Sequence, residues 1–283
     1  MGRFVMLSGP SCVGKGPLHN ALKRFYPHLE RKLEKLVLFN SRAARPGEQD
    51  GVDYHFRPRQ EIEALRGREG YIVLDVRGDL QALDVGNLQG ILSGEKDAFF
   101  EGNPFVPMEV LKSPLLSDVP KLSVFLSPLS RDEILFLKDP TRRVSLPDFV
   151  TGVMRRKLLR RTQKQKGLLS QKDLENIERR ASSAYQEMQL AWHFDYVIPN
   201  HDGEDSENWD AFYYPIGDAR KALLAFAAIL SGQETGYAEQ WERDLLPSRG
   251  PHPRTLSAPP RSPPTLGGEV GGGANFPPRV GGD

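Results

Sequence analysis

The sequence predicts an α/β layered fold, because short apolar segments typical of strands alternate along the chain with segments of helical periodicity. The chain has 283 residues, of which 39% are apolar, so it can bury a sizeable core. A glycine-rich loop separates the first expected strand from the first expected helix. The expected strands are Phe4–Leu7, Val37–Phe39, Tyr71–Val76, Ala98–Phe100, Leu122–Leu126 and Tyr196–Ile198.

Helices are expected between these strands. Leu18, Leu22 and Phe25 share one face of a helix that follows the glycine-rich loop. Asp218 is placed to cap a helix over Ala219–Leu230. A further apolar stripe has mixed three- and four-residue spacing and consists of Ile177, Ala181, Ala184 and Met188.

Charge, apolar runs and cysteine content narrow the functional classes. Thirty-eight Lys and Arg residues balance 37 Asp and Glu residues, so the net charge of +1 gives no whole-chain reason to expect nucleic acid or a membrane as partner. The apolar runs are far shorter than the roughly 20 residues of a membrane-spanning helix. A single cysteine, Cys12, cannot form an intramolecular disulfide, which favours a cytoplasmic location.

Phosphate binding is predicted just after the first strand, where the glycine-rich loop precedes an amphipathic helix. Its glycines allow successive backbone N–H groups to point at one anion, the helix N-terminus adds its positive dipole end, and Lys15 is placed to contact the β- and γ-phosphates. The alternative is a glycine-rich turn that binds nothing. Cys12 is expected to fill space rather than to do redox chemistry. The predicted ATP phosphate loop consists of Gly9, Pro10, Ser11, Cys12, Val13, Gly14, Lys15 and Gly16.

This loop departs from the phosphate-loop pattern at one position. The pattern has Ser or Thr after the lysine, whose hydroxyl binds Mg²⁺, and Gly16 has no side chain. Because Mg²⁺ readily keeps water ligands, a water can take that coordination position. We therefore expect an altered metal requirement.

A second motif lies in Ser41–Phe56, whose sequence is S-R-A-A-R-P-G-E-Q-D-G-V-D-Y-H-F. It resembles the acceptor-phosphate motif of guanylate kinases, T-R-x-x-R-x-G-E-x-x-G-x-D-Y-x-F. Arg42 and Arg45 supply forked, permanently charged donors to a monophosphate, and the Tyr54 hydroxyl adds a hydrogen bond. The resemblance extends to about Leu230. It implies a P-loop nucleoside-monophosphate-kinase fold, in which a largely parallel sheet flanked by helices carries acceptor-binding and lid subdomains.

The base-reading positions of that family are not matched. Val73 falls where the family has a glutamate that reads guanine, and Leu38 replaces a serine that contacts the base. Gln81–Asp84 falls where the family has Tyr-Tyr-Gly-Ser or Tyr-Tyr-Gly-Thr, so a tyrosine of the phosphate clamp is missing. Asp75 or Asp84 is a candidate to substitute from nearby. The resemblance therefore implies a phosphorylated acceptor and leaves its base open.

Two later strand ends supply further candidates. Glu101 falls where the family has a metal-side acid, which makes it the candidate Mg²⁺ residue, with an ordinary strand-end acid as the alternative. Asn103 replaces the second acid of that family motif. Tyr196–Asp202 resembles the closing strand and loop beside the donor adenine, so Asn200 is the candidate donor-base residue.

The resemblance also places a mobile lid at about residues 137–180, whose arginines close on the transferring phosphoryl group. Ile177–Glu187 resembles the family helix that begins I-x-x-R, which makes Arg180 the candidate catalytic arginine and Arg179 the fallback. A second lid arginine is expected upstream. Four candidates remain open for it, namely Arg142, Arg143, Arg160 and Arg161.

The lid region includes a basic arm, residues 142–166, with nine basic side chains and one acid. Such a charge density can bind polyphosphate or nucleic acid by counterion release. Alternatively it forms the solvated face of a lid helix whose Val153, Leu158 and Leu159 pack inward. We favour the lid helix, because the basic residues are not interleaved with aromatic side chains for base stacking.

The expected domain organisation follows from these motifs. A guanylate-kinase-like domain spans residues 1–232, with the acceptor-binding part at about 38–93, and a short extension covers residues 233–246. Residues 247–283 contain nine prolines and eight glycines, a composition that predicts a disordered tail.

The leading hypothesis is a kinase that transfers the γ-phosphoryl group of ATP, with Mg²⁺, to a nucleoside monophosphate such as GMP or a related phosphorylated acceptor. Lys15, Arg42 and Arg180 are the candidate catalytic residues. The contrasting hypothesis is a catalytically weakened guanylate-kinase-like module that binds a nucleotide or an acidic or phosphorylated protein partner. Gly16, Val73 and Asn103 favour the module, whereas an intact Lys15 and Arg180 favour the enzyme.

Overall fold

The computed structural model describes residues 2–45 and 47–246. The predicted disordered tail, residues 247–283, lies outside the described residues. Within the described residues the predicted α/β fold is confirmed: strands and helices alternate, and five strands form one parallel sheet. No helix of this part of the chain is long and apolar enough to cross a membrane.

The main sheet has the strand order β2-β7-β1-β8-β9, and every neighbouring pair is parallel. Because β1 lies between β7 and β8, the segment that follows β1 emerges at the middle of the sheet edge where the carboxyl ends of the strands meet. In open α/β sheets this edge is where ligands bind. The strands are β1 (Phe4–Ser8), β2 (Leu33–Lys35), β7 (Asp97–Gly102), β8 (Lys121–Ser127) and β9 (Tyr196–Pro199).

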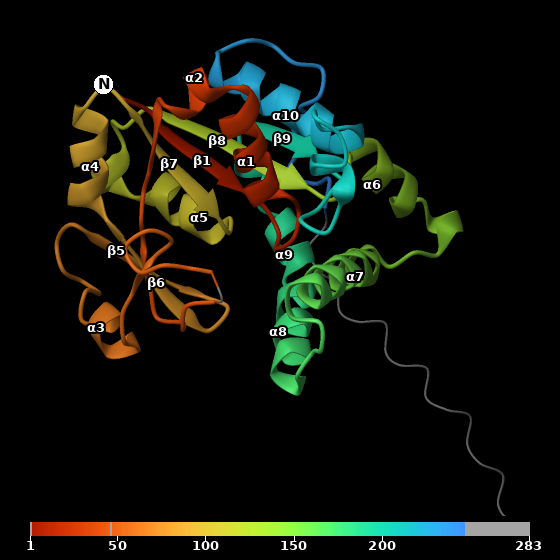
Figure 1. The fold of residues 1–283 in the computed structure, drawn as a ribbon, viewed down its shortest axis with the longest axis horizontal. Coiled ribbons are helices and arrows are strands. Elements are labelled where there is room, and N and C mark those ends of the chain that lie inside the picture. Colours follow the sequence, from red (N-terminus) through yellow and green to blue (C-terminus); the bar gives the residue numbers. More distant parts are fainter. Residues whose placement is uncertain (1, 46, 247–283) are drawn as a thin grey trace, which may run out of the picture. The chain divides into compact units, whose positions relative to one another are not determined.

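Helices cover both faces of the main sheet, as Figure 1 shows. Val5 and Leu7 of β1 face the cluster formed with α1 (Lys15–Phe25) and α10 (Gly217–Leu230). Phe4 and Met6 face the opposite cluster, to which α4 and α5 contribute. The strand is therefore buried on both faces, which explains its uninterrupted apolar sequence. The remaining short helices on this part of the chain are α2 (Pro27–Glu30), α4 (Val85–Ser93), α5 (Phe105–Lys112) and η1 (Pro114–Leu116).

A second, smaller sheet lies beyond one end of the main sheet and has the order β4-β3-β6-β5. Its largest part is an antiparallel hairpin of β5 (Tyr71–Val76) and β6 (Asp79–Asp84), turned at Arg77-Gly78. Both turn residues have positive φ, 57° and 90°, as a tight two-residue hairpin turn requires. The other elements of this part are β3 (Phe39–Asn40), β4 (His55–Phe56) and α3 (Arg59–Glu63).

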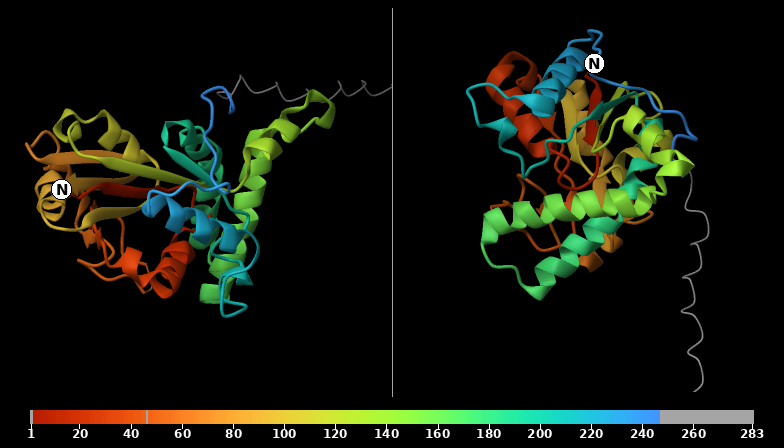
Figure 2. Two further views of the ribbon diagram at one scale, coloured as in Figure 1. Left: turned by 90° about the horizontal axis from the view of Figure 1, so that it is seen from above. Right: turned by 90° about the vertical axis from the view of Figure 1, so that its right-hand side faces the viewer.

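The predicted lid region forms a pair of helices, α7 (Leu146–Lys166) and α8 (Gln171–Ser182), which run side by side in Figure 2. Leu158 is fully buried, and Val153 and Leu159 pack partly buried against the same cluster, so the predicted inward face is confirmed. The predicted apolar stripe of Ile177, Ala181, Ala184 and Met188 is also buried. It continues into a separate helix, α9 (Ala184–Met188). The neighbouring elements are α6 (Arg131–Lys138), η2 (Pro140–Arg142) and η3 (Ala191–His193).

The C-terminal segment after α10 packs back onto the core. Glu239 forms an antiparallel bridge with Val197 of β9, and Trp241 and Leu245 are buried in the cluster beneath α6 and α7. Arg131 at the start of α6 donates to the carboxylate of Glu242 at 2.9 Å. Residues 233–246 are therefore an ordered part of the fold.

Three local expectations are wrong or incomplete. Asp218 does not cap α10; it lies inside the first turn, and Asp202 Oδ2 accepts the Ala219 N–H at 2.9 Å instead. The strand expected at Val37–Phe39 is displaced to Phe39–Asn40, because Leu36 and Leu38 belong to the buried link between the two sheets. The strand β6 was not expected.

Candidate active site

A polar cleft of about 300 Å³ lies at the carboxyl ends of β1 and β7. The phosphate loop, the small sheet and the lid helices contribute to its walls, so it combines segments far apart in the sequence. Its cationic side chains outnumber its acidic ones. The cations are Lys15, Lys35, Arg42, Arg45, Arg77, Arg161, Arg179 and Arg180, and the acids are Glu48, Asp53, Asp79, Glu101 and Glu204.

The phosphate loop connects β1 to α1 at the floor of this cleft. Gly9, Cys12 and Gly14 have positive φ values of 148°, 68° and 103°, so three backbone units are turned as a glycine-rich anion loop requires. A Cβ on Gly14 would lie 2.6 Å from Asn200 Nδ2 and 2.7 Å from the Asp202 carbonyl oxygen. Gly14 is therefore required both by its conformation and by the close approach of the segment after β9.

Lys15 begins α1 and is buried against the loop. Its Nζ donates to the carbonyl oxygens of Gly9 at 3.0 Å and Pro10 at 2.8 Å. Burial lowers the pKa of Lys15, and the carboxylates of Glu204 and Glu101 act in the opposite direction. The ammonium group thus donates to two uncharged carbonyl oxygens, and a charged anion such as phosphate would be a stronger acceptor for it.

Cys12 has the filler role expected for it. The side chain is 1% exposed and packs in the cluster beneath the lid helices. Burial raises the pKa of its thiol to about 12. It is therefore a neutral thiol at physiological pH and is not a nucleophile.

Asn200 supports the phosphate loop from behind and does not line the cleft. Its Nδ2 donates to the carbonyl oxygens of Val13 at 2.8 Å and Asp202 at 2.7 Å, and the residue is fully buried. The structure therefore does not bring the predicted donor-base residue into the site. Its position shows why the sequence pattern needs an amide there: both amide hydrogens are used on backbone.

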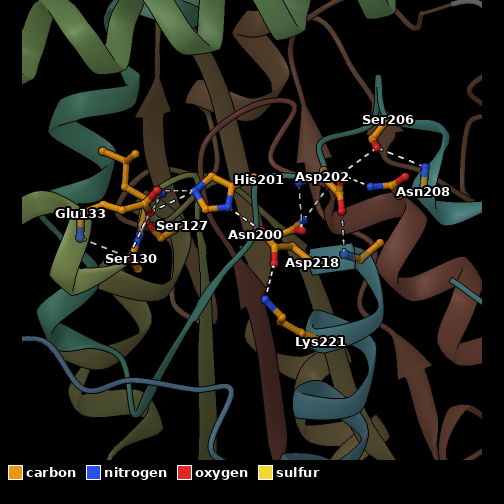
Figure 3. A network of polar contacts seen from close by, with 12 residues as sticks. Ser127, Ser130, Glu133, Asn200, His201, Asp202, Ser206, Asn208, Asp218 and Lys221 are labelled. Carbon is orange, nitrogen blue, oxygen red and sulfur yellow. Dashed lines mark hydrogen bonds and ion pairs between the residues drawn. The ribbon is translucent and has the colours of Figure 1, made fainter. Parts of the chain in front are cut away.

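Figure 3 shows the network that holds the segment after β9 in place. Asp202 accepts from Ser206 Oγ at 2.8 Å, from Asn208 Nδ2 at 2.9 Å and from the Ala219 N–H of α10. His201 lies between two carboxylates, with Nδ1 2.5 Å from Asp218 and Nε2 2.8 Å from Glu133. These contacts join the end of β9 to the starts of α6 and α10. The segment ends with the short helix η4 (Glu207–Trp209).

Glu101 of β7 lies close to Gly16 of the loop, so these two positions show whether the residues fit a magnesium ion. A Cβ built on Gly16 would have one neighbour within 4 Å, Glu101 Oε1 at 3.7 Å. A hydroxyl at position 16 would therefore lie beside a carboxylate, as ligands of a shared cation do. Glu101 also lies 3.5 Å from His19 Nδ1. The donor set fits a hard cation bound through one carboxylate and waters.

The predicted acceptor clamp is built around Glu48. Arg42 donates to both carboxylate oxygens of Glu48, at 2.6 and 2.7 Å, and the Arg45 backbone N–H donates to Oε2 at 2.8 Å. The Arg42 guanidinium also lies over the ring of Tyr54 at 5.2 Å. Burial raises the pKa of Tyr54, so its hydroxyl stays a proton donor. The structure thus brings Arg42, Arg45 and Tyr54 to one wall and shows what the motif glutamate does.

The base end of the cleft differs from the expected arrangement. Val73 is paired with Ala82 and packs toward Ile62, on the face of the hairpin that points away from the cleft. Leu38 does line the cleft. The polar wall is instead formed by Gln81 and Asn103, whose amides are joined by a 3.3 Å hydrogen bond.

Neither acid that was expected to substitute for the missing glutamate lies in the cleft. Asp75 accepts from the Gly78 N–H at 2.8 Å, within the hairpin turn. Asp84 caps α4 through the Asn87 N–H at 3.0 Å. Asp79, at the start of β6, lines the cleft in their place. The hairpin register determines this, because residues 79 and 81 share the inner face.

The predicted lid contributes three arginines to the cleft, Arg161, Arg180 and the fallback candidate Arg179. Arg180 is 9% exposed, and its Nε donates to Ser11 Oγ at 3.0 Å. Burial, followed by the charges of Arg161 and Arg45, lowers the pKa of Arg180 well below the usual arginine value. Arg161 donates to Glu204 at 2.9 Å.

Of the four candidates for the second lid arginine, the structure brings Arg161 into the cleft. Arg142 lies with its guanidinium 3.8 Å from the ring centre of Phe136, and Arg160 is 71% exposed beside Asp205. Neither they nor Arg143 are among the residues that line the cleft.

The basic arm is largely neutralised by acids from neighbouring segments. Arg155 pairs with Glu178 at 2.6 Å, Arg161 with Glu204, and Lys166 with Asp173 at 2.5 Å. Lys164 lies 3.7 Å from Glu207. These contacts support the interpretation of the arm as a lid helix.

Sequence reasoning missed two cleft residues that long-range pairing positions. Arg77, in the hairpin turn, forms an ion pair with Glu187 of α9, which is fully buried and also accepts from Ser183 Oγ at 2.6 Å. Glu204 reaches the cleft from the segment after β9. The one signal for Arg77 was its position before glycine in a two-residue turn, and Glu204 gave none.

Comparison with known proteins finds similar chains among guanylate kinases. The guanylate kinase of Alkalilimnicola ehrlichii is 28% identical over 247 residues, which cover 87% of this chain and 98% of that protein. The chain is guanylate-kinase-like. Shorter matches of higher identity occur with the guanylate kinases of Synechococcus sp., 48% identical over 61 residues, and Streptococcus pneumoniae strain R6, 44% identical over 64 residues. These matches cover 22% and 23% of this chain and 26% and 29% of the relatives.

A solved guanylate kinase from Anaplasma phagocytophilum is 19% identical to this guanylate-kinase-like chain, with a TM-score of 0.49, and the match covers 83% of this chain and 88% of that one. No protein-family model matches the chain.

Proposed function

We propose that this protein is a nucleoside monophosphate kinase of the guanylate kinase type, which transfers the γ-phosphoryl group of ATP to a monophosphate. One observation carries the proposal: the cleft joins a phosphate loop with Lys15 to a separate clamp of Arg42, Arg45 and Tyr54. Two phosphate sites in one cleft are what transfer between two phosphorylated substrates requires.

Each phosphate site has a distinct task in this proposal. Lys15 and Arg180, both at the phosphate loop, stabilise charge on the transferring group. Arg42 and Arg45 fix the acceptor phosphate so that its oxygen faces the donor. Positioning and charge neutralisation carry the catalysis, and the chain forms no covalent intermediate.

Mg²⁺ is the cofactor that this reaction class needs. Glu101 would hold it through water, in the open space beside Gly16. When bound, the ion neutralises charge on the donor phosphates. The acceptor is GMP or a related monophosphate, and Gln81, Asn103 and Asp79 are the polar groups available to contact its base.

A second candidate function is a nucleotide-binding module that has lost most of its catalytic power. Two specific features favour it: Gly16 lacks the metal-binding hydroxyl, and Asn103 stands where the family has an acid. The clamp and the phosphate loop would then serve binding alone.

Turnover of a panel of monophosphates distinguishes the two functions. Purified protein is incubated with ATP, Mg²⁺ or Mn²⁺, and GMP, dGMP, AMP, UMP or CMP, and ³¹P NMR follows conversion of ATP and each monophosphate into diphosphates. We expect conversion of at least one monophosphate and its loss in Lys15→Met. Calorimetric binding of ATP and a monophosphate without any conversion would overturn the enzyme and leave the module.

A further inference from the structure

Glu204 is an acidic residue that lines the cleft together with the predicted phosphate loop. It lies in the segment after β9, which approaches the phosphate loop so closely that a Cβ on Gly203 would be 2.3 Å from the Cys12 carbonyl oxygen. The backbone contact at Gly203, together with that at Gly14, fixes where residue 204 enters the cleft. A carboxylate is thereby brought to a loop whose chemistry selects anions.

Three cations surround this carboxylate. Burial raises the pKa of Glu204, but the charges of Lys15, Arg161 and Arg180 outweigh burial and lower it, so the side chain is ionised. In return, Glu204 is the neighbouring charge that most raises the pKa of Lys15. One carboxylate thus balances the charges of Lys15, Arg161 and Arg180.

The hydrogen bonds of Glu204 are fewer than those of the other carboxylate that holds an arginine in the cleft. Glu48 accepts from both terminal nitrogens of Arg42 and from the backbone of Arg45. Within the described residues, Glu204 accepts one hydrogen bond, from Arg161. The Nε of Arg161 is buried and has no hydrogen-bond partner in this part of the chain, so the hydrogen bonding of this guanidinium is incomplete.

We propose that Glu204 is an internal counter-ion of the donor site and holds Arg161 in the cleft. When the donor nucleotide binds, its polyphosphate replaces Glu204 as the partner of Arg161. Glu204 would therefore set the affinity of the donor site by competing with phosphate for Arg161. This inference rests on the donor site of the proposed function. It adds that Glu204 limits how tightly that site binds the donor nucleotide.

Binding of inorganic tripolyphosphate tests the competition without a base or an acceptor. Isothermal titration calorimetry compares the parent with Glu204→Gln, which keeps the shape and removes the charge. Because one repulsive carboxylate is removed from a partly buried cluster, we expect Glu204→Gln to bind tripolyphosphate about three- to tenfold more tightly. Glu204→Asp keeps the charge and should remain close to the parent.

Glu207→Gln is the matched control. Glu207 lies three residues further on, is 80% exposed and does not line the cleft. It pairs with Lys164 of α7, the helix that also carries Arg161. Its loss should leave tripolyphosphate affinity unchanged. If Glu204 acts through Arg161, the gain from Glu204→Gln should also shrink in an Arg161→Met background, a non-additivity that a general change in net charge would not produce.

Each outcome has a defined meaning. A Glu204→Gln protein that is folded by circular dichroism and binds tripolyphosphate no more tightly than the parent overturns the inference. Should Glu204→Gln fail to fold, Glu204→Ser provides the same comparison. A parent that binds neither tripolyphosphate nor ATP overturns the donor site itself, and with it the proposed function. A gain in Glu204→Gln that equals the gain in Glu207→Gln refutes the specific role of Glu204.

Discussion

Replacing Arg42 by alanine tests the acceptor clamp most directly. Three of the five N–H groups of Arg42 are used within the described part of the chain, two on Glu48 and one on the Ala43 carbonyl oxygen. The remaining donors belong to a guanidinium that lines the cleft and is 14% exposed. Arg42→Ala therefore removes the donors of this guanidinium that are left for a monophosphate in the cleft.

The size of the effect follows from the number of bonds lost. One hydrogen bond to a charged group contributes about 1.5–3 kcal/mol, which corresponds to about a 10- to 150-fold weakening of monophosphate binding. The change also leaves the half-buried Glu48 with the Arg45 backbone N–H as its remaining donor. We therefore expect a moderate loss of stability, about 1–2 kcal/mol, in a protein that still folds.

Isothermal titration calorimetry with GMP, or with the monophosphate that is turned over best, measures this loss. Arg57→Ala is the matched control, because Arg57 belongs to the same motif region, pairs with Asp50 at 2.9 Å on the exposed side and does not line the cleft. That surface pair contributes about 0–1 kcal/mol to stability and nothing to the clamp. Equal monophosphate affinity in Arg42→Ala and Arg57→Ala would refute the assignment of Arg42 to the acceptor site.

Three further predictions concern the metal, the basic arm and pH. Gly16→Ser should lower the Mg²⁺ concentration needed for half-maximal activity without changing monophosphate affinity, because the new hydroxyl lies near Glu101; an unchanged metal midpoint contradicts this. Gel shifts over a salt series should show no sub-micromolar binding of DNA or RNA by the arm at 142–166, whose charges are largely paired; tight, salt-sensitive binding would reverse that interpretation. Burial lowers the pKa of His201, but its hydrogen bond to Asp218 and the charge of Glu133 outweigh burial and raise it. The pKa of His201 is therefore 6.5 in the unfolded chain and higher in the folded protein. The stability that His201 contributes should be fully present below pH 6.5 and be lost as the pH rises through the folded pKa. A urea midpoint that falls equally over this window in His201→Asn would disprove the prediction.

The sequence was most informative where short-range rules apply. The phosphate loop could be predicted because Gly9, Gly14 and Lys15 stand at fixed distances from a buried strand, and the structure turns the backbone there as expected. The inward face of α7 followed from the spacing of its apolar residues. In both cases neighbours within one or two turns determine the conformation.

Other features depend on contacts between distant residues and could not be predicted. Four arginines were equally compatible with the second lid position, and what selects Arg161 is a carboxylate 43 residues away. β6 has no apolar alternation strong enough to mark it, because Gln81 faces a polar cleft. Asn200 matched a site motif, yet its amide is used on the backbone of Val13, which no local pattern reveals.

Glu48 and Glu204 each hold an arginine in the cleft, but they accept different numbers of hydrogen bonds. Glu48 accepts three hydrogen bonds, so under the proposed function the clamp is already arranged and a monophosphate should bind with little reorganisation. Glu204 accepts one within the described residues, so Arg161 can exchange it for phosphate when the donor binds. Part of the donor's binding energy would then be spent on displacing Glu204, and Arg161 would contact phosphate in the same cleft as Arg180. Under the proposed function, the arginine that exchanges its partner thus lies on the donor side of the cleft, where the charge of the transferring phosphoryl group would develop.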